Sequence, residues 1–162
     1  METERFATWI RGLARRTGAG ETGADALALP DRVEVRACVD GEDERSCVAA
    51  HLRAWTLAGI SPSETAVIAG RGDVAEAVAG KAAAAGVRVG EIGMTDVSEL
   101  RALALVGCDA RFVASEPDGF GMPTHERESI LPVLRACSAP SEHLLITWRG
   151  WPAMLFGALA EE

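Results

Sequence analysis

The chain contains two apolar stretches that decide its fold class: LALVGCD at residues 103–109 and HLLITWRG at residues 143–150. Apolar runs without regular polar alternation are typical of strands that are covered on both faces of a sheet. We predict a strand at residues 97–106, a helix at residues 126–136 that Pro132 interrupts, a last strand at residues 144–148 and a terminal helix at residues 152–160. Together with the apolar run TAVIA at residues 65–69, this alternation predicts an α/β fold in which flanking helices cover a mainly parallel sheet in three layers.

The N-terminal part of the chain differs from the rest in composition. Residues 2–16 place apolar side chains on one helical face and arginines largely on the other, which predicts a short amphipathic helix. Residues 17–28, TGAGETGADALA, have no periodic apolar pattern and predict a flexible connection that ends at Pro30. We therefore expect an N-terminal helix with a linker over residues 1–30 and a single α/β domain over residues 31–162.

The charge balance limits which partners the chain can bind. Its 24 acidic and 16 basic side chains give a formal net charge of -8, which opposes binding to the phosphate backbone of nucleic acids. We expect weak nucleic-acid binding or none. No apolar run reaches the roughly 18 residues that a membrane-spanning helix needs, and the N-terminus, with two glutamates in its first four residues, lacks a signal-peptide pattern. These features predict a cytoplasmic protein with no membrane contact.

The cysteines and histidines give no metal signature. The four cysteines form no C-x-x-C pair and have no zinc-type spacing. Cys108 and Cys137 lie in apolar segments, where a thiol packs as a small hydrophobic group. His51 lies on a predicted helix and His143 at a predicted strand start, and no spacing links them as ligands. We therefore expect reduced structural cysteines and no metal site.

Three segments carry a family resemblance. The helix DERSCVAAHLR at residues 43–53 and the segment GISPSETAVI at residues 59–68 resemble the opening of the second RecA-like domain of UvrD/Rep-type superfamily-1 DNA helicases. The stretch TWRGWPAMLF at residues 147–156 is similar to the final strand, turn and terminal helix of that domain. The resemblance extends over about residues 33–157 and implies a RecA-like fold of the P-loop-NTPase type.

The chemical residues of this family are mostly replaced. In the window EIGMTDVSE at residues 91–99, Glu99 matches the acidic residue of the segment that couples nucleotide to DNA, whereas the histidine, lysine and glycine of that segment are missing. Ala139 and Ser141 stand where the closing motif has two arginines, one of which is aimed at the γ-phosphate. The 162 residues also contain no G-x-x-x-x-G-K-[ST] loop to hold a triphosphate. The resemblance therefore implies a degenerate domain with no ATPase or helicase activity of its own and no cofactor.

The segment between residues 109 and 128 offers one candidate chemical site. It leaves the carboxyl end of a predicted strand, where ligands bind in open α/β sheets, and it carries Asp118, His125 and Glu126. A histidine with nearby carboxylates can transfer protons or bind a cation. The competing interpretation is structural, because acids near the start of a helix are ordinary and the resembled helicases have a variable acidic insertion here.

Five aromatic side chains form the second candidate site, an interface for a protein partner or for a second copy of the chain. The candidates are Phe6, Trp9, Trp148, Trp151 and Phe156. Most such side chains belong to the core, and the N-terminal helix could cover this face itself or dock in a partner. The leading hypothesis is a stand-alone binding or scaffolding module, which binds another protein or forms a homodimer. The alternatives are a small-molecule-binding protein or enzyme that uses residues 109–128, and a helicase subunit whose ATP-binding half is on another chain.

Overall fold

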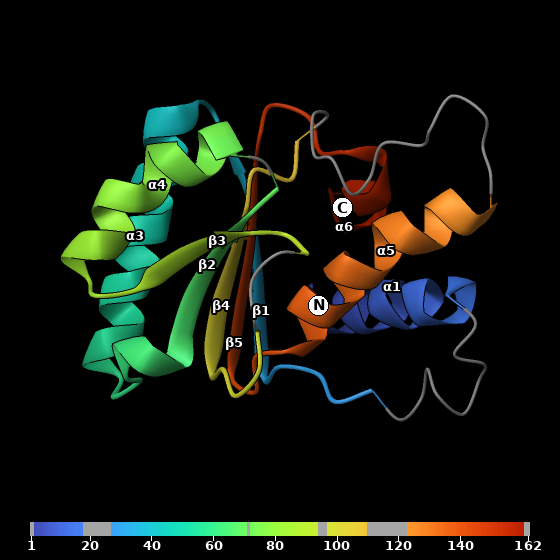
Figure 1. Ribbon diagram of the computed structural model, residues 1–162, viewed down its shortest axis with the longest axis horizontal. Coiled ribbons are helices and arrows are strands. Elements are labelled where there is room, and N and C mark those ends of the chain that lie inside the picture. The colour runs from blue at the N-terminus through green and yellow to red at the C-terminus, as the bar shows by residue number, and fades with distance from the viewer. Residues whose placement is uncertain (1, 18–26, 71, 94–96, 110–122, 161–162) are drawn as a thin grey trace.

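The computed structural model describes residues 2–17, 27–70, 72–93, 97–109 and 123–160, with only the backbone at residues 2, 123–129 and 154. Within these ranges, five parallel strands form one sheet in the order β1-β5-β4-β2-β3 (Figure 1). The strands are β1 (Arg32–Cys38), β2 (Thr65–Ala69), β3 (Arg88–Glu91), β4 (Ala102–Val106) and β5 (His143–Arg149).

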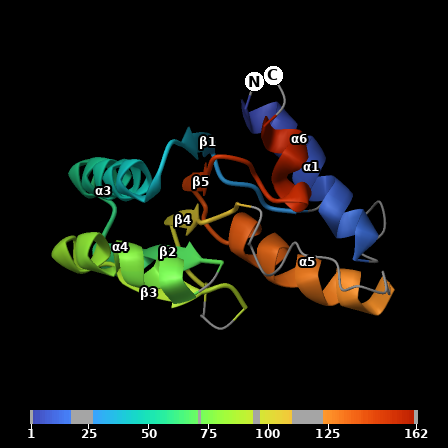
Figure 2. The same ribbon diagram turned by 90° about the horizontal axis from the view of Figure 1, so that it is seen from above.

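Helices lie on both faces of this sheet. One face is covered by α3 (Gly41–Leu57) and α4 (Gly72–Ala84), and the other by α1 (Glu2–Arg16), α5 (Pro123–Ser138) and the short α6 (Gly157–Ala160), as Figure 2 shows from above. Two 3-10 turns, η1 (Pro62–Glu64) and η3 (Met154–Phe156), complete the described elements. The predicted three-layer α/β fold is confirmed. None of the helices in the described part of the chain is long and apolar enough to cross a membrane.

The strand β2 shows how the sheet divides the core in two. All five of its residues are buried, and successive side chains of a strand point to opposite faces. Ala66 and Ile68 pack with residues of α1 and α5, whereas Val67 and Ala69 pack with residues of α3 and α4. β4 is buried along its whole length as well. A strand covered on both faces has no side to present to water, which explains why both runs are almost wholly apolar.

The N-terminal helix is part of the core of this domain. Phe6 is fully buried in the cluster that α5 and the sheet also form, and the rings of Trp9 and Phe156 have centroids 5.4 Å apart. The Trp9 Nε1–H donates a hydrogen bond to the Leu155 carbonyl at 2.7 Å. α1 therefore covers this face of the sheet itself. Most of the predicted linker, residues 18–26, lies outside the described residues.

Three predicted element boundaries were wrong. The strand expected from residue 97 begins only at Ala102, because Glu99 has a left-handed backbone with φ of 59° and interrupts the extended chain. The C-terminal helix expected from residue 152 begins later, since Pro152 forms an isolated bridge with Asp109. The interruption expected at Pro132 is absent, and α5 continues through this residue.

Candidate functional site

The five parallel strands end at the carboxyl edge of the sheet, which lies at the top of Figure 1. Here β4 runs into Asp109, which is buried and bridges to Pro152. The predicted loop site also belongs to this edge, but residues 110–122, with Asp118, lie outside the described residues. His125 and Glu126 lie at the start of α5, where only the backbone is described. The acid/base arrangement of these three residues therefore stays a prediction.

The structure separates the five aromatic interface candidates into two groups. Phe6, Trp9, Trp148 and Phe156 are all buried within the chain's own core. They are not available to a partner in this fold, because α1 and α6 close over the sheet face that they occupy. Trp151, in contrast, is 83% exposed on the turn that follows β5. An exposed tryptophan is unusual, since burial of its large apolar surface stabilises the fold.

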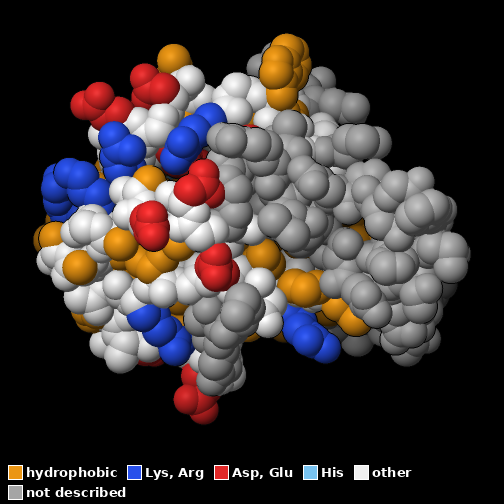
Figure 3. All heavy atoms as spheres, turned by 45° about the horizontal axis from the view of Figure 1, so that its top comes forward, with side chains coloured by type: hydrophobic (Ala, Val, Ile, Leu, Met, Phe, Trp, Pro, Cys, Tyr) orange, Lys and Arg blue, Asp and Glu red, His pale blue; other side chains and the backbone are white. Residues whose placement is uncertain are grey.

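A second exposed apolar residue, Val39, lies just after the end of the adjacent strand β1. β1 and β5 pair in parallel, with Cys38 opposite Arg149, and the Gly150 N–H donates to the Cys38 carbonyl at 3.1 Å. Val39 follows Cys38 directly and is 86% exposed, and Trp151 lies two residues after Arg149. We call these two residues the Trp151–Val39 surface. Figure 3, which brings the top of Figure 1 forward, shows acidic and basic side chains interspersed among the hydrophobic ones on this face.

A buried carboxylate holds the base of this surface in place. Glu44, at the start of α3, is fully buried. Its carboxylate accepts hydrogen bonds from Thr147 Oγ1 at 2.7 Å, from the Gly107 N–H at 3.1 Å and from Arg149 Nε at 2.8 Å. A buried charge is tolerated when a counter-charge and further donors satisfy it, and here one carboxylate joins α3, β4 and β5. The turn that carries Trp151 therefore begins at Arg149, a residue that Glu44 holds in position.

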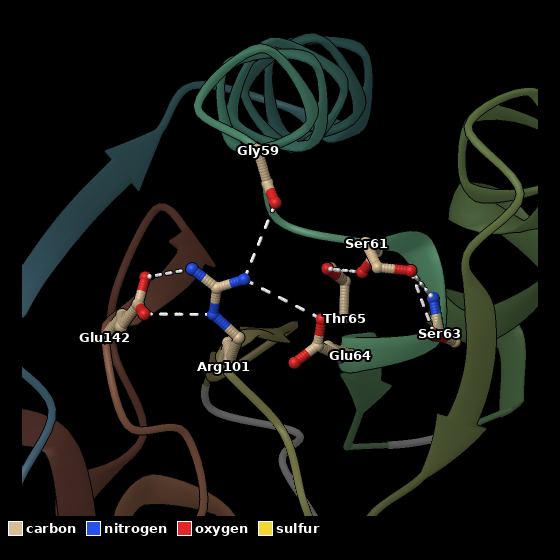
Figure 4. A network of polar contacts seen from close by, with 7 residues as sticks. All are labelled: Gly59, Ser61, Ser63, Glu64, Thr65, Arg101 and Glu142. Atoms are coloured by element: carbon tan, nitrogen blue, oxygen red, sulfur yellow. Dashed lines mark hydrogen bonds and ion pairs between the residues drawn. The ribbon is translucent and has the colours of Figure 1, made fainter.

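The opposite edge of the sheet carries a different polar arrangement, centred on Arg101 (Figure 4). Its Nε and Nη2 donate to the two carboxylate oxygens of Glu142 at 2.9 and 3.1 Å. Its Nη1 lies 3.7 Å from a Glu64 oxygen and donates to the Gly59 carbonyl at 3.5 Å. The hydrogen bonds from Arg101 lower the pKa of Glu142 below its ordinary value. This guanidinium is held by two carboxylates of its own chain.

The two positions at which the sequence resemblance predicts arginines, Ala139 and Ser141, lie at this same edge. Ala139 and Ser141 follow α5, and the Ser141 N–H donates to the Leu100 carbonyl at 3.1 Å, directly beside Arg101. Arg101 is therefore a neighbour of the position where the resemblance expects positive charge. Its guanidinium does not substitute for that charge, because bidentate pairing with Glu142 directs it along the edge of its own sheet. Glu99, the retained motif residue, lies nearby on an exposed turn.

A small cavity and an open groove lie among the described residues. A cavity of about 80 Å³ between the β2–β3 edge and α5 is lined by residues that include Ile68, Glu91 and Arg135. An open groove of about 430 Å³ between α3 and α4 is lined by residues that include Arg53 and Lys81. The cavity is far smaller than the ~300–1,000 Å³ of ordinary small-molecule sites, and the groove is open to solvent. No three histidine, cysteine or acidic side chains in the described ranges are grouped to hold a metal ion.

One polar cluster was not predicted from the sequence. His51 on α3 contacts Cys47, one helical turn earlier, with 3.7 Å between Nδ1 and Sγ, and its Nδ1–H donates to the Cys47 carbonyl at 2.8 Å. Its Nε2–H donates to the Glu34 carboxylate of β1 at 2.5 Å. These contacts, first that with Cys47, raise the pKa of His51 from 6.5 to about 9, although burial opposes the shift. The sequence did contain a signal for part of this cluster, because Cys47 and His51 are four residues apart on a predicted helix and such side chains are neighbours.

No protein-family model and no curated protein matches this chain. Among solved structures, it is similar to the C-terminal domain of a possible DNA helicase from Lactobacillus plantarum WCFS1. The match has a TM-score of 0.56 at 15% sequence identity, and it covers 94% of this chain and 91% of the other. A likeness at this identity establishes a common fold and carries no residue roles. The chain therefore has the α/β fold of a helicase C-terminal domain.

Proposed function

We propose that this chain is a helicase-C-terminal-like module that binds another protein and does not hydrolyse ATP. The observation that carries the proposal is Trp151, which is 83% exposed on a turn anchored by the ion pair of Arg149 with the buried Glu44. Tryptophans dominate the binding energy of many protein interfaces, because a rigid indole buries a large area at little entropic cost. The fold likeness and the sequence resemblance both support a helicase-derived origin for the module.

The chemistry of the amino edge supports a non-hydrolytic role. Phosphoryl transfer needs positive charge aimed at the γ-phosphate, and the two expected positions hold Ala139 and Ser141. The nearby Arg101 is engaged by Glu142 and Glu64. The sequence also has no phosphate-binding loop of the Walker type. An ATP-dependent reaction would thus need another chain to supply both the positive charge at the γ-phosphate and the phosphate-binding loop.

The charge around the Trp151–Val39 surface favours a protein partner over nucleic acid. The turn and first helical residues that follow Val39 include the exposed acids Asp40, Glu42 and Asp43. Acids at this position repel phosphates, in line with the net charge of -8. They complement a partner that presents an apolar pocket with a basic rim. A second copy of the chain is the other candidate, since an exposed apolar residue can pair with itself across a two-fold axis.

A comparison of two exposed apolar residues tests this proposal. Leu57, at the end of α3, is 82% exposed and provides a matched control on a different part of the surface. The tagged full-length chain and its Trp151→Ala and Leu57→Ala variants are used to capture proteins from the lysate of the native host, and their masses are measured by sedimentation. We expect Trp151→Ala to lose captured partners or a dimer that Leu57→Ala retains. Equal capture and equal mass for all three chains contradict the proposal.

A further inference from the structure

Four reactive or charged side chains meet between the edge strand β1 and α3. Cys47 and His51 lie one turn apart on the helix, and His51 contacts Glu34 of β1. Cys38 lies four residues after Glu34, so both point to the α3 face of the strand. Arg149, which lies opposite Cys38, contacts Glu44, one turn before Cys47 on α3, and Cys47 is near enough to contribute to the raised pKa of the Cys38 thiol. None of the four cysteines is in a disulfide in this structure. The two thiols are therefore reduced neighbours.

The two thiols differ in their surroundings. Cys47 is only partly buried and has the His51 ring beside its sulfur. Cys38 is buried, and burial together with the proximity of Cys47 raises the pKa of its thiol to about 12. A thiol reacts with peroxide in its ionised form and must be reached by the oxidant. Cys47 is therefore the thiol of this pair that an oxidant can reach, and Cys38 is placed to react second.

We propose that Cys38 and Cys47 form a redox-sensitive dithiol, which hydrogen peroxide converts to a disulfide with Cys47 as the attacking sulfur. The Cys47 thiolate bonds to one peroxide oxygen while the O–O bond breaks, and the departing hydroxide takes a proton from His51 to form water. Cys47 is then a sulfenic acid. The Cys38 sulfur attacks the Cys47 sulfur, the S–O bond breaks, and the hydroxide released takes the Cys38 proton as a second water. Two thiols are oxidised and one peroxide is reduced to two waters.

Glu34 and His51 act in this reaction as positioning and proton-donating groups. Both ring N–H groups of His51 are donors, to Glu34 and to the Cys47 carbonyl, which is the pattern of a protonated imidazole. The Glu34 carboxylate fixes the ring and stabilises its positive charge. The ring can thus deliver a proton beside the Cys47 sulfur, where the hydroxide leaves.

The other two cysteines provide an internal control. Cys108 and Cys137 are fully buried, and burial raises the pKa of each thiol well above its ordinary value. The Cys108 Sγ–H donates to the Leu105 carbonyl within the core. A buried, protonated thiol is inert toward peroxide. The proposal therefore predicts selective loss of two of the four thiols.

Tryptic digestion separates all four cysteines, which makes the test direct. Cleavage after arginines places Cys38 in residues 37–45 and Cys47 in residues 46–53, and places Cys108 and Cys137 in two further peptides. The folded full-length chain is treated with hydrogen peroxide, quenched, alkylated and digested, and the peptides are followed by mass spectrometry over time. We expect the peptides 37–45 and 46–53 to become linked by a disulfide about tenfold faster than Cys108 or Cys137 reacts.

Single variants assign the two roles. In Cys38→Ser, Cys47 should stop at a sulfenic acid that dimedone traps, and in Cys47→Ser, Cys38 should stay reduced at the rate of the buried cysteines. His51→Gln should slow formation of the 37–45/46–53 link about fivefold, since the proton donor is lost. Circular dichroism of each variant checks that the fold is intact. A link only between different chains, sulfinic acid at Cys47 with Cys38 intact, or four thiols that react at one rate would each overturn the proposal.

Discussion

The two edges of this parallel sheet differ in whether their surface side chains have partners within the chain. At the amino edge, Arg101 is closed off by Glu142 and Glu64, at the place where the helicase resemblance expects arginines directed outward. At the carboxyl edge, the buried Glu44 pairs with the partly buried Arg149, and Trp151, two residues later, is exposed. A charged group that pairs internally stabilises the fold, whereas an apolar group left in water gains stability only when a partner covers it. The difference places the candidate binding surface at the carboxyl edge.

Among substitutions at the two edges, Glu44→Ala should lower the free energy of unfolding the most. This change leaves the Thr147 hydroxyl, the Gly107 N–H and the Arg149 guanidinium without their common acceptor. We expect the free energy of unfolding in urea to fall by about 3 kcal/mol, as when one partner of a buried pair is removed. Glu42→Ala, at an exposed position in the same helical turn, should cost about 0.5 kcal/mol. Equal losses for the two variants would show that Glu44 does not brace this edge.

The contact between His51 and Glu34 should make the stability of the fold depend on pH. The folded pKa of His51, about 9, lies above its ordinary value of 6.5. Its contribution is therefore complete below pH 6.5 and is lost as the pH rises through 9. We expect the stability advantage of the wild-type chain over His51→Gln to shrink across this range by on the order of 2 kcal/mol, allowing for solvent screening at Glu34.

Urea unfolding of both chains at several pH values measures this difference and cancels the ionisation of the cysteines in the unfolded state. The pKa of Glu34 is lowered by its hydrogen bond with His51, so the same advantage should also shrink as the pH falls below 4.5. Parallel stability profiles for the two chains would mean that the imidazole does not gain a proton on folding.

A smaller effect should follow from Arg101→Ala at the amino edge. The network is partly exposed, and ion pairs of this kind are weakened by water and salt. We expect a small loss in the free energy of unfolding, which becomes smaller as salt is added. Arg53→Ala, at an exposed position on α3, is the control and should change stability by less than about 0.5 kcal/mol. If the two substitutions are indistinguishable at low salt, the amino edge is not closed by this network.

The smallest effect on stability should be that of Trp151→Ala. Because the side chain is exposed, its removal should change the free energy of unfolding by less than about 0.5 kcal/mol. Trp148→Ala, three residues earlier, should cost about 3–5 kcal/mol, since that side chain is buried. Thermal or urea unfolding of both variants measures the contrast. A large loss for Trp151→Ala would mean that the residue has a structural role within the chain.

The fold class was predictable because strands that are buried on both faces appear in the sequence as runs of apolar residues. The runs of β2, β4 and β5 contain almost no polar residues, and helical segments separate them, so a parallel sheet follows. The beginning of β4 was missed because the left-handed backbone at Glu99 has no signal in a non-glycine residue. Strand ends depend on such local conformations, and the apolar pattern does not record them.

The candidate sites were less predictable, because their geometry depends on distant contacts. Glu44 stands among exposed acids in sequence, and its burial depends on donors that lie 63, 103 and 105 residues away. The helical pattern of Phe6 and Trp9 indicated an apolar face but not what would cover it, and the chain's own core does so. Trp148 and Trp151 look alike in sequence, and only the turn after β5 separates a core side chain from an exposed one.

Photo-crosslinking from the carboxyl edge tests the central claim most directly. A photoreactive phenylalanine analogue is placed at position 151 or, as the control, at position 57 of the full-length chain, and both proteins are irradiated in the native lysate. Both positions are exposed, at 83% and 82%, so random collisions label them equally. A discrete protein adduct or a crosslinked dimer from position 151 alone is the result that the account predicts. Adducts from both positions alike, or from neither, would contradict it.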